Sequence, residues 1–593
     1  MNQKIFLLSA TTRRYITNQS LLLPLVLLLL LTNLLVSPVG EFSLNDDWIH
    51  AKAVQRLLEE GQYRGHSYVA ATLVAQAYWG ALFCKIFGFS FTVLRVSTLV
   101  LSLVGAWAMA GCGLALGLSR NLALLCGALV AINPLVLNLS YSFMTDVPFL
   151  AMSILSGLFF LLALQTPRAP LIFWGSCFAV IAFFVRQFGV MLPVAFAATV
   201  FVLWCQKQYR VSWSMVFALI CPWLAAVAIA LYLGTIKDAG TPVFQSLQER
   251  LLMSAMDGLR HIPVSLCYIG FFALPLGAGR LGQIVRKYDV WNRKRLTIFL
   301  GFCCASLAMF FLPKILFFVG SVFLNKQSLW LNQYAYRMPL LKGDYLLDLA
   351  VGHIQLSDVN PQPVVSIGGW WWPITFAALG VAGLIFLNCV DIFYDVRRQQ
   401  DENNVLQKRT HQKLFLLLWG CILLAIAYNP WRFFVYDRYL IPALPPLILL
   451  LAYEMSRFKL KGAMWLATFS CTLLYIFSVV CLQDYMGWNS AATAAQNKLM
   501  TVYGVNSESI RGLDTFNGWY NSDKFMQIYK TKKWQDADLT GLGPWVFDDE
   551  YIVATKQPKP GYEKFEEIPY FSWLGMQERA IVIYKRGQNE SRI

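Results

Sequence analysis

The stretch from Leu21 to His50 reads LLLPLVLLLLLTNLLVSPVGEFSLNDDWIH and contains the two features that decide the fold. Its first half is uncharged and strongly apolar, as expected of a helix that crosses a bilayer, which needs about 20 such residues. Its second half turns polar and carries two adjacent carboxylates, Asp46 and Asp47, ahead of a segment that closes at Gly61. We therefore expect a first membrane span, retained rather than cleaved as a signal, followed by a polar helix at one face of the membrane.

The composition indicates that most of the chain lies in lipid. Of its 593 residues, 57% are hydrophobic and only 14% are charged, whereas soluble proteins have about 25% charged residues. Because an open sheet cannot satisfy its backbone in hydrocarbon, we predict an all-α polytopic membrane protein. The formal net charge of +16 does not indicate nucleic-acid binding, since the basic residues collect in short loops, as topology signals do.

Apolar runs predict about thirteen transmembrane helices. They lie at 20–38, 93–117, 121–139, 147–164, 170–185, 188–205, 213–233, 263–282, 296–320, 371–391, 414–428, 438–455 and 462–482. The 13 cysteines fall mostly inside these runs, without the paired spacings of metal sites, so we expect buried hydrophobes and neither a zinc site nor a disulfide framework.

The run 70–89 is ambiguous, because it is apolar but carries polar and charged residues such as Gln76 and Lys85. If it lies at the interface, nearly all dense basic clusters fall on one side of the membrane, as positive-inside topology requires. We therefore interpret 70–89 as an interfacial or re-entrant helix. The outer face then receives the first loop at 39–92, two short turns near 140–146 and 186–188, longer loops at 234–262 and 321–370, and a turn at 429–437.

The composition changes near residue 484, which divides the chain into a transmembrane domain at 1–483 and a C-terminal domain at 484–593. The C-terminal part is polar and has short β-like runs at Tyr551–Val553 and Ala580–Tyr584. Its length of about 110 residues suffices for a modest core of its own. We predict a small extracytoplasmic α/β domain.

Ionisable residues gather on the predicted outer face, where each is costly unless it is paired or functional. Asp46 and Asp47 come from the first loop, Asp146 precedes a span, and Arg186 and Arg438 stand at the ends of others. A carboxylate can accept the proton of a hydroxyl, and guanidinium groups bind phosphate bidentately. The five residues therefore suit a reaction between a lipid phosphate and a hydroxyl.

Each residue also has a purely structural interpretation. Asp46 and Asp146 could cap the helices that follow them, and the two arginines could be interfacial residues whose charge reaches water. His50, one turn after Asp46, is either a metal ligand or a structural polar contact, of which we favour the second. Their common side of the membrane favours a shared site over independent caps.

Four segments resemble the GT-C-type membrane glycosyltransferases, in the group of protein O-mannosyltransferases and lipid A aminoarabinose transferases. The similar segments are Asp46-Asp47 with Leu57-Leu58-Glu59-Glu60-Gly61; Tyr78–Phe83 through Phe87-Gly88-Phe89-Ser90 to Leu94-Arg95; Asn133-Pro134 with Thr145-Asp146; and Asp437-Arg438-Tyr439-Leu440-Ile441-Pro442-Ala443-Leu444-Pro445. The segment Phe516–Tyr520 and the C-terminal outer domain also fit this group.

The resemblance implies a GT-C fold and transfer of a sugar, with inversion, from a polyprenyl-phosphate donor at the extracytoplasmic face of the plasma (inner) membrane. It implies that Asp46 is the general base, that Asp47 and Asp146 complete the catalytic carboxylates, and that Arg186 and Arg438 bind the donor phosphate. The acceptor is a lipid, glycan or protein. No cofactor is implied with certainty; some relatives outside this group place a divalent cation between such carboxylates, and carboxylate oxygens suit one.

One departure separates the chain from the lipid A enzymes. Those enzymes have a phosphate-binding lysine in a Lys-Pro-Pro segment, where this chain reads His66-Ser67-Tyr68-Val69. Two other classes of function stay open, a flippase or transporter of lipid-linked sugars and a structural membrane protein. A transporter is expected to show inverted repeats and helices broken at the midplane, and the sequence shows neither.

Overall fold

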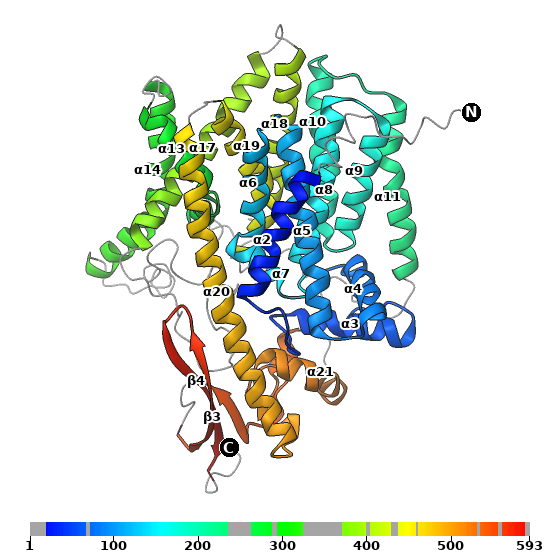
Figure 1. The fold of residues 1–593 in the computed structure, drawn as a ribbon, viewed down its shortest axis with the longest axis vertical. Coiled ribbons are helices and arrows are strands. Elements are labelled where there is room, and N and C mark those ends of the chain that lie inside the picture. The colour runs from blue at the N-terminus through cyan, green and yellow to red at the C-terminus, as the bar shows by residue number, and fades with distance from the viewer. Residues whose placement is uncertain are drawn as a thin grey trace.

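A long helical bundle with a small sheet at one end makes up the protein in a computed structural model (Figure 1). The structure describes residues 19–66, 71–234, 262–286, 293–323, 371–398, 404–427, 437–457, 461–530, 534–555 and 560–587. The predicted loops at 234–262 and 321–370 and the turn at 429–437 lie almost entirely outside these ranges.

The helices follow the predicted apolar runs closely. In chain order they are α2 (Gln19–Leu35), α3 (Asp47–Glu60), α4 (Val74–Phe87), α5 (Phe91–Ala115), α6 (Arg120–Ala131), α7 (Pro134–Ser140), α8 (Asp146–Gln165), α9 (Ala169–Phe183), η2 (Gln187–Val190), α10 (Met191–Cys205), α11 (Trp213–Gly234), α13 (Leu274–Arg286), α14 (Arg293–Phe323), α17 (Trp371–Arg398), α18 (Asn404–Ala427), η5 (Asp437–Ala443), α19 (Leu444–Ser456), α20 (Lys461–Thr501), η6 (Ser507–Ser509), α21 (Asp514–Tyr529) and η7 (Trp534–Asp538).

Seven helices in the described ranges are long and apolar enough to cross a membrane, or nine if each of two bent helix pairs forms one span. The predicted class, a mostly helical multi-pass membrane protein, is confirmed at this level. Each of the predicted runs overlaps a helix, but the exact number of thirteen spans is not confirmed and stays a prediction.

Helix α4 lies beside α3 at the end of the bundle (Figure 1). Its 14 residues extend for about 21 Å, less than the roughly 30 Å of a hydrocarbon core. Gly88 ends it, and the Ser90 side chain accepts a hydrogen bond from the Val93 N–H to begin α5. This length favours the interfacial helix that we predict for 70–89.

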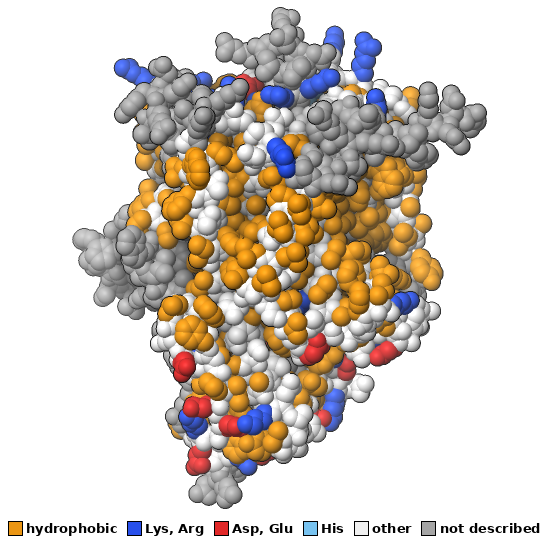
Figure 2. Space-filling view, in the orientation of Figure 1, with side chains coloured by type: hydrophobic (Ala, Val, Ile, Leu, Met, Phe, Trp, Pro, Cys, Tyr) orange, Lys and Arg blue, Asp and Glu red, His pale blue; other side chains and the backbone are white. Residues whose placement is uncertain are grey.

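Charge is distributed unevenly along the long axis (Figure 2). Lysine and arginine side chains lie along the upper rim, apolar side chains form a wide band below it, and acidic and basic side chains are mixed at the lower end. The lower end is the one that carries α3, α4 and the sheet. The distribution agrees with basic residues on one side of a membrane and the first loop on the other.

The C-terminal sheet has four strands in the order β1-β2-β4-β3. They are β1 (Ile510–Arg511), β2 (Tyr551–Ala554), β3 (Tyr562–Ser572) and β4 (Gln577–Arg586). β1 runs parallel to β2, and the other neighbours are antiparallel, with Val553 opposite Ile583. Both predicted β-like runs are strands, and α21 and this sheet confirm the small α/β element.

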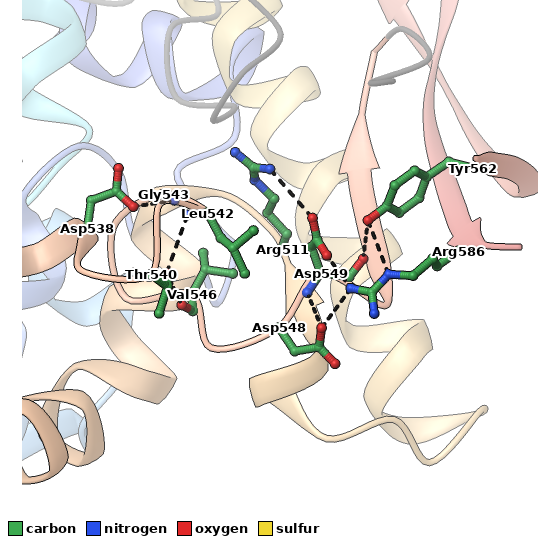
Figure 3. A network of polar contacts seen from close by, with 10 residues as sticks. All are labelled: Arg511, Asp538, Thr540, Leu542, Gly543, Val546, Asp548, Asp549, Tyr562 and Arg586. Carbon is green, nitrogen blue, oxygen red and sulfur yellow. Dashed lines mark hydrogen bonds and ion pairs between the residues drawn. The ribbon is translucent and has the colours of Figure 1, made fainter. Parts of the chain in front are cut away.

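A charged network fixes the loop before β2 on the sheet (Figure 3). Arg586 of β4 pairs with Asp548, 2.7 Å away, and with Asp549. Arg511 of β1 lies 3.9 Å from Asp549, whose main-chain oxygen accepts a hydrogen bond from the Tyr562 hydroxyl. The network holds the loop that delivers Trp545 to the first outer loop.

Helix α20 joins the bundle to the sheet without a break. Its 41 residues pass through the predicted boundary between 483 and 484, and its last turns pack on β3. The division into 1–483 and 484–593 stays a prediction, with a continuous helix rather than a linker at the junction.

Candidate active site

Asp47 is a structural carboxylate that ties the first loop to the turn before α8. It is 1% exposed; its Oδ1 accepts the Leu44 N–H at 2.7 Å and its Oδ2 accepts the Phe143 N–H at 3.1 Å. Burial raises the pKa of this carboxyl to about 7, against the lowering effect of Arg95 and of the two backbone N–H groups. Both of its oxygens are therefore occupied by the protein.

Two further side chains contact Phe143, at its carbonyl group. His50 Nδ1 and Gln76 Nε2 lie 3.1 Å and 2.8 Å from the Phe143 carbonyl oxygen. The Phe143 ring lies against Gly80 of α4, where a Cβ would come within 2.5 Å of it. Phe143 is thus the point at which α3, α4 and the turn before α8 meet, although sequence reasoning gave it no role.

His50 stands among the charges of the site. Burial lowers its pKa to about 4, and the charges of Asp46, Arg186 and Asp146 also act on it. Its hydrogen bond to Phe143 makes it the structural polar contact that the sequence favours.

Asp46 is placed differently from its neighbour. It occupies the N-cap position of α3, yet its side chain makes no capping hydrogen bond, so the capping interpretation is not what the structure shows. The side chain is 44% exposed, and its Oδ2 lies 3.9 Å from Arg438 Nη2. An accessible carboxylate beside a guanidinium can accept a proton from a bound hydroxyl.

Asp146 and Arg186 form a buried ion pair. Arg186 Nη2 donates to Asp146 Oδ2 at 3.0 Å, and Arg186 Nε donates to the Thr145 hydroxyl at 2.7 Å. Asp146 is 3% exposed, and within the described ranges its Oδ1 has no hydrogen-bond partner. Leaving one member of such a pair unpaired typically costs about 3–5 kcal/mol, so the pair fixes α8 to the start of η2.

Tyr439 joins the two arginines. The guanidinium carbons of Arg186 and Arg438 lie 5.9 Å and 5.8 Å from the centre of its ring. A tyrosine ring face attracts cations, so one ring orients two guanidinium groups from distant parts of the chain. The signal for Tyr439 was present in the sequence, since it directly follows Arg438, but its role could not be assigned without the contact.

The structure therefore brings all five predicted site residues to one end of the bundle. Asp46 approaches Arg438, Arg438 and Arg186 share Tyr439, and Arg186 binds Asp146. Asp47 belongs to the framework of the same site rather than to its accessible surface. Their catalytic and phosphate-binding roles stay predictions.

Arg95 of α5 binds the backbone of the first loop. This fully buried side chain donates to the carbonyl oxygens of Pro38, Gly40 and Phe42. Three carbonyls from one short segment converge on a single guanidinium, so the loop follows a fixed path from α2 to Asp46. Arg95 closes the Leu94-Arg95 motif quoted above, which thus has a structural function here.

The C-terminal helix α21 closes over α3. Lys52 and Arg56 of α3 pair with Asp523 at 2.8 Å and 3.1 Å. Trp48 lies so close to Gly518 that a Cβ there would come within 2.4 Å of its ring. Burial raises the pKa of Asp514, at the start of α21, to about 7, and the charge of Asp46 adds to this shift. The C-terminal part is thus a wall of the site.

The carboxylates do not fit a divalent cation well. Among the described residues, no three His, Cys, Asp or Glu side chains are grouped as ligands would be. Asp47 already accepts two N–H groups, and Asp146 is bound to Arg186. Positive charge at these acids is supplied by guanidinium groups.

One family of known proteins matches part of the chain. Residues 74–233 match the family described as dolichyl-phosphate-mannose-protein mannosyltransferase. The predicted resemblance is confirmed. The matched region runs from α4 to α11 and includes Asp146 and Arg186, whereas Asp46 and Arg438 lie outside it. No curated protein matches the chain.

Solved structures of three membrane enzymes are similar over much of the chain. ArnT from Cupriavidus metallidurans bound to undecaprenyl phosphate is 11% identical, with 97% of this chain and 100% of that chain covered and a TM-score of 0.41. AglB from Archaeoglobus fulgidus, an archaeal oligosaccharyltransferase in complex with an inhibitory peptide and a dolichol-phosphate, is 13% identical, with 92% and 61% covered and a TM-score of 0.42. The arabinosyltransferase EmbB from Mycobacterium smegmatis is 12% identical, with 82% and 42% covered and a TM-score of 0.33. At these scores the likeness carries no argument of its own.

The raised pKa of Asp47 predicts a pH-dependent stability. An unfolded aspartate releases its proton near pH 4, whereas folded Asp47 keeps its proton until about pH 7. Its contribution to the free energy of unfolding is therefore largest below about pH 4 and falls as the pH rises to about 7. Relative to Asp47→Asn, the wild type should lose stability across this range in denaturant unfolding of the solubilised protein.

The control for this experiment is Glu59→Gln, an exposed residue of the same helix. Its difference from the wild type should not change with pH over the same range. A difference between wild type and Asp47→Asn that stays constant from pH 4 to 7 would contradict the assignment; the hydrogen bond lost in the variant adds only a constant offset.

Proposed function

We propose that the protein is a membrane glycosyltransferase that transfers a sugar from a polyprenyl-phosphate donor to an acceptor hydroxyl. The observation that supports this most strongly is the accessible Asp46 carboxylate beside Arg438, in one cluster with Arg186 and Asp146. A base and two cations side by side are what attack by a hydroxyl on a sugar phosphate requires. The match to a mannosyltransferase family supports the same reaction class.

In this mechanism, Asp46 accepts the proton of the acceptor hydroxyl as the hydroxyl oxygen attacks the anomeric carbon. The bond between that carbon and the phosphate oxygen breaks, and the polyprenyl phosphate leaves with the electron pair. Attack from the side opposite the leaving group inverts the configuration. The negative charge that develops on the phosphate falls to Arg438 and Arg186, whose guanidinium groups form strong charge-assisted hydrogen bonds.

Asp146 positions Arg186 in this scheme. A guanidinium has five N–H donors, so the contacts of Arg186 to Asp146 and Thr145 leave donors for a phosphate. The second carboxylate oxygen of Asp146, which has no partner in the described part of the chain, can accept a hydrogen bond from a sugar hydroxyl. Asp47 holds the first loop rather than taking part in the chemistry.

The proposed reaction uses no residue of the segment His66-Ser67-Tyr68-Val69, which stands where the lipid A enzymes have their phosphate-binding lysine. His66 lies against the Trp48 ring, with centroids 5.6 Å apart, and 67–70 lie outside the described residues. The phosphate contacts therefore fall to arginines. Two helix pairs are sharply bent, Arg120–Ala131 with Pro134–Ser140 and Ile262–Phe272 with Leu274–Arg280, and broken helices also occur in transporters. We favour the glycosyltransferase because the charged residues stand at helix ends, with Asp46 before α3, Asp146 at the start of α8 and Arg186 before η2.

Replacement of Asp46 tests the assignment of the base. Asp46→Asn keeps the shape of the side chain but removes its basicity, so transfer should fall by about 10²–10⁴-fold in a protein that still folds. The measurement is mass spectrometry of envelope lipids and glycans from a deletion strain complemented with the variant. Glu59→Gln, on the surface of the same helix, should restore the wild-type product; full restoration by Asp46→Asn would refute the assignment.

The side of the membrane is part of the proposal. We place the site and the C-terminal part on the extracytoplasmic face of the plasma membrane, since basic residues gather at the opposite end (Figure 2). In a protein without its natural cysteines, Lys85→Cys on α4 should react with an impermeant maleimide in intact cells. Arg457→Cys, at the other end, should react only after permeabilisation. The reverse pattern would contradict this orientation.

A further inference from the structure

An open cleft, whose space is about 350 Å³ when the solvent-filled part is counted, lies between the first loop, the last turns of α20 and α21. Its walls include Phe91, Phe516, Trp519 and Tyr520 among aromatic residues, and Gln496 and Asn497 among amides. Neither the family match nor the proposed chemistry assigns it a role, because none of these residues belongs to the cluster around Asp46 and the arginines.

The cleft holds a polar group that the protein leaves unused. Gln496 is 1% exposed, and its Nε2 has no hydrogen-bond partner among the residues that the structure describes. A buried amide donor without a partner is costly, so such groups in native proteins call for an explanation. A ligand hydroxyl that reaches this atom would supply the missing acceptor.

The remaining lining favours a neutral ligand with hydroxyl groups. Among the described residues, no lysine or arginine lines the cleft, and the one carboxylate there, Glu41, already accepts from Thr92 and from the Phe91 N–H. Among the aromatic residues, Phe91 and Phe516 are buried, whereas Tyr520 is 49% exposed and offers a flat apolar face to a ligand. Faces that pack on C–H groups, combined with amides and hydroxyls that pair with O–H groups, match the two kinds of surface of a sugar ring.

The cleft is continuous with the catalytic loop. Ser43, in its wall, precedes Asp46 by three residues and therefore lies at most about 11 Å from it along the backbone. The Ser43 hydroxyl donates to the Thr515 carbonyl oxygen at 3.5 Å, which joins the loop to α21. A ligand unit in the cleft would therefore place an adjoining unit near the base.

We propose that this cleft binds a neutral hexose unit of an acceptor glycan and presents the adjoining hydroxyl to Asp46. The proposal rests on the glycosyltransferase function proposed above and selects a glycan among the lipid, glycan and protein acceptors. A peptide that binds by strand addition is less suited to it, because this mode needs an open strand edge and the walls of the cleft come mainly from helix side chains.

Ligand-observed saturation-transfer NMR on the full chain tests the proposal. The protein is held in nanodiscs, since detergents with sugar headgroups would compete, and the probes are maltotriose, cellotriose and mannotriose. We expect saturation of at least one trisaccharide. Tyr520→Ala and Gln496→Ala should each weaken this binding about tenfold or more, and Asn497→Ala serves as a third variant if either fails to fold.

Two controls separate this proposal from the proposed chemistry. Thr501→Ala, an exposed residue one turn further along α20, should bind as the wild type does. Asp46→Asn should also bind normally while failing to transfer sugar. Normal transfer by Asp46→Asn with intact trisaccharide binding would refute the base but not the cleft.

Three results would overturn the cleft proposal. They are no saturation of any of the three trisaccharides by folded protein, equal binding by the wild type and all three cleft variants, and displacement of a bound trisaccharide by a Ser/Thr-rich hexapeptide at lower concentration than by another trisaccharide. The last result would assign the cleft to a peptide acceptor.

Discussion

The arrangement of the site depends on how one residue, Phe143, is held. Its N–H is bound by Asp47, and its carbonyl by His50 and Gln76, so three side chains of the first loop, α3 and α4 grip the turn that begins α8. These groups are buried, and a buried polar group that loses its partner costs free energy. The constraint fixes the first loop at the Asp46 turn relative to the start of α8, where Asp146 binds Arg186. The two adjacent carboxylates therefore differ in role: Asp47 is buried and holds the first loop to the turn before α8, and Asp46 stays accessible.

The C-terminal part packs against α3 and so completes the wall of the site. The network around Arg586 fixes the loop before β2 (Figure 3). This loop carries Trp545, whose ring lies 6.0 Å from that of Trp48 on α3. Asp523 binds two cations of α3, and Gly518 admits Trp48 against α21. α20 runs unbroken from the bundle to the sheet and so links the two parts. The same closure creates the cleft that we assign to the acceptor.

Much of the fold could be predicted, because each apolar run must form a helix wherever it meets lipid. The strands at Tyr551 and Ala580 were also visible as short β-like runs. The sequence could place the five charged residues on one side through the positions of basic loops, but it could not show which carboxylate is buried, since Asp46 and Asp47 differ only in where the turn points them. The roles of Phe143 and Tyr439 could not be predicted from the sequence either. The hydrogen bonds to the Phe143 backbone and the contacts of two arginines with the Tyr439 ring form only when distant segments pack together.

The central claim is that the arginine pair on Tyr439 binds the phosphate of the lipid donor beside Asp46. An electron cryo-microscopy structure of the full chain with bound undecaprenyl phosphate tests it most directly. The account predicts phosphate oxygens within hydrogen-bonding distance, about 2.7–3.2 Å, of the guanidinium groups of both Arg438 and Arg186. A phosphate bound away from both arginines, for instance at the basic rim near Arg457, would contradict it.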